Sequence, residues 1–123
     1  MRAKLNRWQR IFSSAAELDA EQMRRTAAES GADAIEDVVS GQITTLNGVL
    51  QSILYGSEDK LPLLEADLFD GSGHVDLKWI GRRRIRGIEP GVAISVRGRL
   101  VKCDGRMTMF NPIYTLLPKG SAE

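Results

Sequence analysis

The sequence predicts a mainly β domain in which five strands close into a small Greek-key barrel, preceded by an α-helical segment. Two observations lead to this fold class. Short segments alternate between apolar and polar residues with a period of two, and turns that contain glycine separate these segments. A chain of 123 residues is one domain by length. We expect a helical segment over residues 1–40, the barrel over 41–118 and a polar tail over 119–123.

The N-terminal residues have the periodicity of an amphipathic helix between residues 5 and 30. Leu5, Trp8 and Phe12 recur at three- and four-residue steps, which places them on one stripe of a helix. Asp19 is typical of an N-cap and Gly31 of a helix end, so we expect two helices or one helix broken near Asp19. Such a stripe docks on its own barrel or on a second copy, or lies on an anionic membrane; we favour docking.

The first three strands are expected to form a meander. Residues 42–55 are rich in β-branched and aliphatic side chains around Gly48, a position that is typical of a bulge or a sharp bend. A polar connection over 56–60 leads to a second strand at 64–69 and, after the glycine turn 70–73, to a third strand at 74–80. Trp79 shares the inward parity of its apolar neighbours, so we expect it in the core.

A charged connection separates this meander from a closing hairpin. Residues 81–90 carry too much charge and too many glycines for a strand, which indicates one helical turn or a bridging loop. The fourth strand is expected at 93–101 and the last at 107–117, bent or interrupted at Asn111-Pro112. A meander, a linking element and a closing hairpin follow the strand order of the OB-fold. The inward positions of the fourth strand would be Ile94, Val96, Gly98 and Leu100.

Four segments also resemble a known family. LFDGSG, VDLKWIGRRRIRGIEPG, VRGRL and FNPIY resemble short actinobacterial proteins described as OB-fold nucleic-acid-binding-domain proteins and, more distantly, the wedge domain of RecG-type helicases. The resemblance covers residues 41–117 and implies a five-stranded OB barrel that binds nucleic acid without chemistry. Nothing in the sequence resembles a phosphate-binding loop or a motor domain, so the DNA-junction role of the helicase wedge is not carried over.

Charge is distributed unevenly along the chain. The net charge is only +1, yet residues 38–77 hold 1 basic and 6 acidic side chains (−5) and residues 78–119 hold 10 basic and 2 acidic ones (+8). A one-sided basic surface is the electrostatic footprint of a polyanion binder.

The basic region supplies the predicted phosphate-binding residues. They are the arginines of the charged connection, the outward arginines of the fourth strand and the cations beside the last hairpin turn: Arg82, Arg83, Arg84, Arg86, Arg97, Arg99, Lys102 and Arg106. Phe69 has outward parity and is the best candidate for stacking on a base, whereas Tyr55, Phe110 and Tyr114 remain undecided. The alternatives for these residues are a solvated loop and protection of a sheet edge.

Three carboxylates oppose this interpretation. Glu65, Asp67 and Asp76 share the outward side of the second and third strands, a face that many OB-folds use for nucleic acid, and there they would repel phosphate. Either the binding surface has moved towards the arginines and the closing hairpin, or the partner is a protein of mixed charge.

The sequence offers little for catalysis. A lone His74, a lone Cys103 and no nucleophile or phosphate-cradle motif predict no enzyme, no cofactor and no metal site. One cysteine and no secretory or membrane-spanning run indicate a reducing cytoplasm. We therefore expect a non-enzymatic binder of single-stranded or irregular DNA or RNA with low sequence specificity. The alternative is a protein-interaction module that uses the barrel or the N-terminal helix, including a homodimer.

Overall fold

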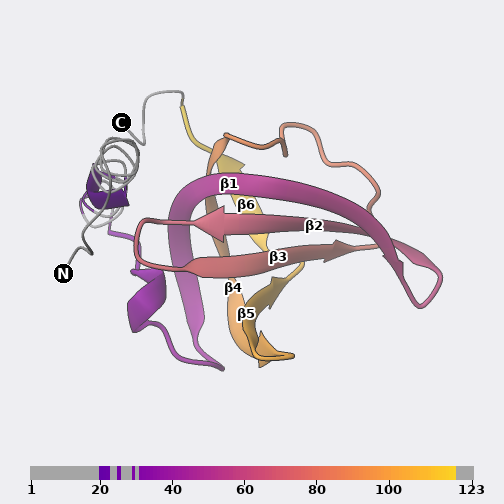
Figure 1. Cartoon of the computed structure of the whole chain (residues 1–123), viewed down its shortest axis with the longest axis horizontal. Coiled ribbons are helices and arrows are strands. Elements are labelled where there is room, and N and C mark those ends of the chain that lie inside the picture. The colour runs from indigo at the N-terminus through magenta and orange to yellow at the C-terminus, as the bar shows by residue number, and fades with distance from the viewer. Residues whose placement is uncertain (1–19, 23–24, 26–28, 30, 119–123) are drawn as a thin grey trace, which may run out of the picture.

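The computed structural model describes residues 20–22, 25, 29 and 31–118. Residues 20–22, 25 and 29 are helical; the remainder of the predicted N-terminal helix, including the Leu5, Trp8 and Phe12 stripe, lies outside the described residues, as does the tail 119–123. No helix in the described ranges is long and apolar enough to cross a membrane. The elements in chain order are η1 (Ile35–Asp37), β1 (Ile43–Glu58), β2 (Leu61–Phe69), β3 (His74–Ile80), β4 (Ala93–Cys103), β5 (Arg106–Phe110) and β6 (Ile113–Leu116) (Figure 1).

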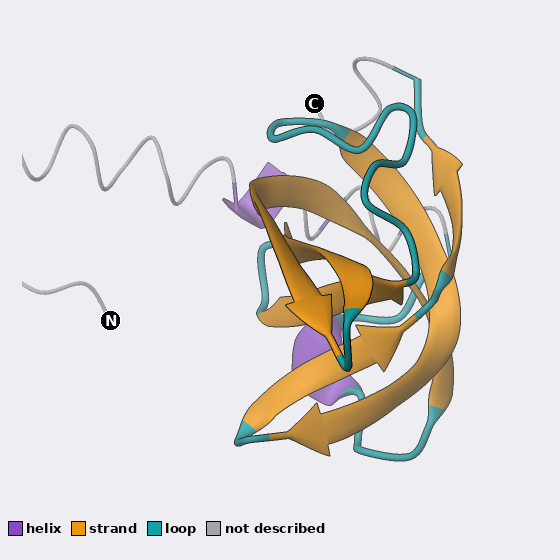
Figure 2. Ribbon diagram, turned by 90° about the vertical axis from the view of Figure 1, so that its right-hand side faces the viewer, coloured by secondary structure: helices purple, strands orange, loops and turns teal. Residues whose placement is uncertain are grey.

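Five of the strands close into a ring. β1 pairs antiparallel with β2 through its second half and with β4 through its first half. β3 pairs antiparallel with β2 and parallel with β5, and β5 pairs antiparallel with β4, which completes the circuit β1–β2–β3–β5–β4–β1. Figure 2 shows the strands curving around a common interior. The mainly β, ring-closed fold predicted from the alternation is thus confirmed.

The predicted interruption of the last strand is also found, and it produces the sixth strand. Asn111 has a positive φ of 49°, and its backbone N–H donates to the carbonyl of Lys78 over 2.6 Å. Its side-chain Oδ1 accepts the N–H of Ile80 at 2.9 Å, and the Pro112 carbonyl accepts the indole N–H of Trp79 at 3.1 Å. The chain therefore leaves β5 against β3 and continues as β6 along β4.

β1 is longer than the sequence predicted. It continues to Glu58, and β2 already begins at Leu61, so the polar connection predicted over 56–60 is wrong: only Asp59 and Lys60, with φ of 48° and 67°, form the turn. These end segments form an exposed two-stranded arm at the right of Figure 1. Because water surrounds such an arm, its polar residues do not mark the end of a strand.

Gly48 is required by a close approach and not by the bulge itself. The register shift of β1 falls between Leu50 and Ser52. A Cβ atom on Gly48 would lie 2.5 Å from the carbonyl oxygen of Phe69, which is closer than side chains allow. Glycine lets β1 pass tightly over the end of β2 and turn from β4 towards β2.

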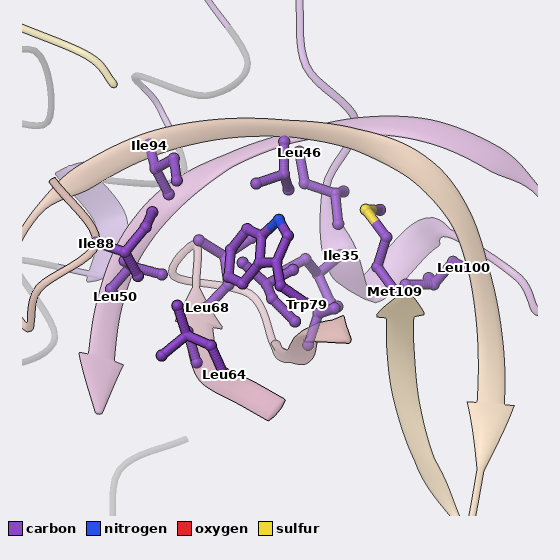
Figure 3. Packing of buried hydrophobic residues seen from close by; sticks show 14 of the residues in the cluster. Ile35, Leu46, Leu50, Leu64, Leu68, Trp79, Ile88, Ile94, Leu100 and Met109 are labelled. Atoms are coloured by element: carbon purple, nitrogen blue, oxygen red, sulfur yellow. The ribbon is translucent and has the colours of Figure 1, made fainter. Parts of the chain in front are cut away.

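The core lies inside the ring. The predicted inward residues Ile94, Val96 and Leu100 are fully buried, and Trp79 is 4% exposed, as expected. Residues outside the strands close the interior: Ile35 lies near the β2–β3 turn, where its Cγ2 would meet a Cβ on Gly73 at 2.9 Å. Ile88 lies beside Leu50 and Ile94 (Figure 3). The remaining core residues are Val38, Leu46, Leu64, Ala66, Leu68, Val75, Leu77, Ile85 and Met109.

The LFDGSG motif is organised by Asp70. This carboxylate is 1% exposed and accepts hydrogen bonds from the backbone N–H groups of Ser72 (2.8 Å), Gly73 (3.0 Å) and Ile35 (2.8 Å), and from the Ser72 hydroxyl (2.7 Å). A buried carboxylate is tolerated when donors surround it in this way. Asp70 thus shapes the turn and attaches η1 to it.

Candidate nucleic-acid interface

The outer side of β2, β3 and β5, together with the part of β1 that pairs with β2, forms a surface that we call the outer face. Directly paired residues of neighbouring strands point to the same side, so the strand register fixes its rows. The rows are Leu54, Glu65, Lys78 and Phe110; then Ser52, Asp67, Asp76 and Thr108, of which Thr108 is fully buried; then Val49, Phe69 and His74.

Each carboxylate of the outer face has a cationic or titratable partner. Glu65 lies 3.3 Å from the ammonium of Lys78, and Asp67 lies 3.0 Å from Nδ1 of His74. Partial burial opposes the charge on Lys78, but the hydrogen bond and the attraction of Glu65 outweigh it and raise the pKa of Lys78. The acids that the sequence placed here are therefore not bare, which reduces the expected repulsion of phosphate.

Asp76 is held by one of the predicted phosphate-binding residues. Nε and Nη2 of Arg106 donate to the two carboxylate oxygens of Asp76 over 2.6 and 2.7 Å. This hydrogen bond and the charge of Asp76 raise the pKa of Arg106. Arg106 is therefore a positive charge whose donor fork is already engaged.

The two phenylalanines of the outer face differ in availability. Phe69, the stacking candidate from the sequence, is half-buried, and its ring stacks on His74 with centroids 4.7 Å apart and planes 24° apart. Phe110 is 39% exposed, and the Lys78 ammonium lies 5.8 Å from its ring centroid. Phe110 is thus an exposed aromatic that sequence reasoning left undecided. The signal that could have identified Phe110 is its position next to Met109: successive side chains of a strand point to opposite sides, so an inward Met109 places Phe110 outside.

The predicted arginine cluster lies on a loop between β3 and β4. Ile85 and Ile88 are 3% and 4% exposed, and the N–H of Gly81 donates to the Pro62 carbonyl at 2.7 Å, so the loop is anchored. The arginines between and beside these anchors are exposed, and no described residue engages them in an ion pair: Arg82, Arg83, Arg84 and Arg86. Of the two alternatives that the sequence left for residues 81–90, one helical turn or a bridging loop, the structure has the loop.

The eight predicted cations do not form one patch. Arg82 lies two residues beyond Ile80, the last residue of β3, whereas Arg106 is bonded to Asp76 near the start of β3. With about 3.3 Å per residue along a seven-residue strand, the two positions lie at opposite ends of the outer face. Lys102 belongs to the Arg106 end, because it lies beside the same β4–β5 turn.

Arg97 and Arg99 lie on another side of the ring. Both are exposed on the outward side of β4, next to β1, and β5 separates them from β3. Arg97 donates to the hydroxyl of Thr45 at 2.7 Å, and Arg99 donates to the carbonyl of Gly41. Their outward orientation agrees with the sequence.

The centre of the outer face is hollowed. A depression of about 330 Å³ is lined by Ser52, Leu54, Glu65, Ala66, Asp67, Asp76 and Arg106. A second depression of about 540 Å³ is lined by Asp67, His74, Gly105, Arg106 and Met107. Asp67 and Arg106 border both, so the two form one region. No group of three or more metal-ligating side chains occurs among the described residues.

Solved structures with DNA share this architecture. One is the structure of RecG bound to a three-way DNA junction, with a TM-score of 0.58 and 24% identity over 71% of this chain. The chain spans only 12% of that RecG chain. Another is a Replication Protein A heterotrimer bound to ssDNA, with a TM-score of 0.50 and 15% identity over 79% of this chain and 78% of the other. No family model matches the sequence, and no curated protein matches it.

The chain has an OB-like fold. In OB-folds, oligonucleotides bind to the face of the second and third strands and to the loops that join strands one to two and four to five. In this OB-like chain that region is the outer face with its hollow, bordered by the Asp59-Lys60 turn and the Asp104-Gly105 turn. The fold and the surface features therefore point to the same side of the molecule.

Proposed function

We propose that this protein is a non-enzymatic nucleic-acid-binding OB-fold protein that takes single-stranded or irregular DNA or RNA with little sequence preference. The observation that carries the proposal is the combination of an anchored loop of exposed arginines, which no described residue engages in an ion pair, with a hollowed face that exposes Phe110. Cations that bind the backbone and aromatic rings that stack on bases are the two elements of single-strand recognition. The RecG and Replication Protein A structures that share the fold are both of proteins bound to DNA, which supports the proposal.

The charge pattern favours a single strand over a duplex. On the outer face, cations and carboxylates are paired, so a continuous line of phosphates would find few free partners there. A single strand can turn its bases onto this face and place its phosphates at the margins. The arginine loop supplies one such margin, and Lys102 supplies the other, where Arg106 is already bonded to Asp76.

The remaining roles follow from these positions. Phe110 is a stacking platform, and Phe69 contributes through its stack with His74. Arg86, Arg97 and Arg99 extend the positive field around the ring. Four further predictions belong to this proposal. The chain divides into a helical segment over 1–40, an OB domain over 41–118 and a tail over 119–123, and it resembles actinobacterial OB-fold proteins. The protein carries out no catalysis and acts in the cytoplasm.

One observation favours a second function, that of a protein-interaction module. The β1–β2 arm exposes Leu54, Tyr55 and Leu61 at 62%, 63% and 51%, and the neighbouring charges are of both signs. A protein partner of mixed charge and apolar character would fit such a surface. In that case the arginines would meet the acids of the partner.

Fluorescence anisotropy distinguishes the two functions. The titration uses labelled single-stranded DNA, single-stranded RNA and duplex DNA of about 20 nucleotides at about 50 and 200 mM salt. We expect micromolar or tighter binding to the single strands, weakening with salt and changing little with sequence. Absence of binding to all three at low salt would overturn the proposal and direct the search to protein partners.

Phe110→Ala tests the stacking platform. We expect the variant to lose about 1–3 kcal/mol of binding free energy for single strands, because one base loses its aromatic partner. The salt slope should stay the same, since no charge is removed. Tyr55→Ala is the matched control: it removes a more exposed aromatic side chain from the arm and should change affinity less than about twofold. Equal affinities of Phe110→Ala and the unmodified protein would exclude Phe110 from the site.

A further inference from the structure

The contact between Arg106 and Asp76 has the geometry with which arginine binds phosphate. Two parallel N–H groups of a guanidinium face two oxygens at 2.6 and 2.7 Å. The same planar fork fits a carboxylate and a phosphate equally. Asp76 therefore occupies one of the donor pairs of Arg106 that a nucleic-acid phosphate could use.

The position of the pair makes this occupation relevant to binding. Arg106 borders both depressions of the outer face, with Asp67 beside it in each. Its side chain is 62% exposed, whereas that of Asp76 is 21% exposed, so the guanidinium is the accessible member. Of the eight predicted phosphate-binding cations, Arg106 is the one that a carboxylate holds among the described residues.

We propose that Asp76 is an internal competitor that limits phosphate binding at Arg106 and thereby directs the nucleic-acid backbone away from the hollow that Arg106 borders. This inference rests on the proposed nucleic-acid-binding function. A phosphate that takes the Nε–Nη2 pair of Arg106 must displace Asp76, and one that takes the remaining N–H groups lies close to the Asp76 carboxylate. The arginine loop therefore holds most of the nucleic-acid backbone. The hollow between Asp67 and Asp76 is left to bases, whose amino groups can donate hydrogen bonds to carboxylates.

The pair is suited to exchange because it lies at the surface. Ion pairs in water contribute little net stability, since solvent screens the charges and the side chains lose freedom. A ligand phosphate can thus replace Asp76 without unfolding any element. The expected effect of Asp76 is a graded reduction of affinity and not an all-or-none block.

Asp76→Asn tests the competition, because it removes the charge and keeps the shape of the side chain. We expect affinity for single-stranded DNA to rise about threefold to tenfold, and the slope of log affinity against log salt to steepen by about 0.7, the value of one added phosphate contact. The double variant Asp76→Asn with Arg106→Ala should lose this gain. Thermal unfolding of each variant verifies that it is folded.

Asp104→Asn is the matched control for charge alone. Asp104 lies in the β4–β5 turn two residues from Arg106, and its φ of 53° is one that asparagine also adopts. The Asp104→Asn variant should raise the affinity for single-stranded DNA less than Asp76→Asn does, and it should leave the salt slope nearly unchanged. An equal gain from Asp104→Asn, or a gain that survives in the double variant, would overturn the inference, because the effect would then be long-range charge and not release of Arg106.

The unmodified protein supplies an independent measurement. The NMR resonance of the Arg106 Nε–H group should move when single-stranded DNA is added, since the donor passes from Asp76 to phosphate. If the unmodified protein binds DNA, a resonance that stays in place at saturation overturns the inference while the proposed function stands. If neither the unmodified protein nor Asp76→Asn binds any oligonucleotide, the proposed function fails, and the inference fails with it.

Discussion

Replacing Arg82, Arg83 and Arg84 together by alanine should weaken binding to single-stranded oligonucleotides on the order of a hundredfold at low salt. Three exposed guanidinium groups lie on one anchored loop, and each phosphate that they neutralise contributes about 0.7 to the salt slope. The slope should therefore fall by about 2 in the triple variant. Anisotropy titrations over a series of salt concentrations measure both quantities.

The fold should not change in this variant, because the loop is held by Ile85 and Ile88 and not by the arginines. The free energy of unfolding is expected to stay within about 0.5 kcal/mol. The matched control replaces the same three residues by lysine, which keeps the charge and most of the salt slope but loses the planar fork. If the alanine variant binds as the unmodified protein does, the arginine loop is a solvated loop, and the proposed site lies elsewhere.

Trp79→Ala is expected to reduce the free energy of unfolding by about 3–5 kcal/mol. The indole is 4% exposed inside the ring and packs edge-on against Tyr114, with centroids 6.0 Å apart and planes at 80°. Its N–H also donates to the carbonyl of Pro112 at 3.1 Å, which fixes the break between β5 and β6 against β3. Removing the side chain leaves a cavity and an unpaired carbonyl, and such a loss is a large part of the stability of a small domain.

Urea unfolding followed by circular dichroism measures this loss. Trp79→Phe is the control that keeps an aromatic ring in the core but removes the donor, and we expect it to cost about 1–3 kcal/mol. A loss below about 1 kcal/mol in Trp79→Ala would contradict the core role. Trp79 would then become a candidate for stacking on a base.

Several elements could be predicted from local pattern alone. The third strand was predicted at 74–80 and is found as His74–Ile80, because its apolar residues alternate without interruption against a polar outer side. The same reasoning placed Ile94, Val96 and Leu100 inside. Both features depend on burial of one side of a strand, and burial leaves a period of two in the sequence. The strand break at Asn111-Pro112 was located by the proline, which has no N–H to donate to a neighbouring strand.

Other elements left no such signal. The exposed end of the β1–β2 arm buries neither side, so its strands could not be distinguished from a polar loop. The bulge of β1 follows from pairing with two different strands, and Gly48 from the approach of the Phe69 carbonyl. Both depend on neighbours that are distant in the chain.

For the candidate site, the sequence by itself determined the parity of the charged residues, the outward orientation of the arginines and the concentration of positive charge after residue 78. Only the tertiary structure decided which charges meet. Asp76 and Arg106 are 30 residues apart, and the parallel pairing of β3 with β5 brings them together. Ring closure also separates Arg106 from Arg82, because each lies at a different end of β3. Parity is a local property of one strand, whereas the partner and the distance of a side chain follow from the register between strands.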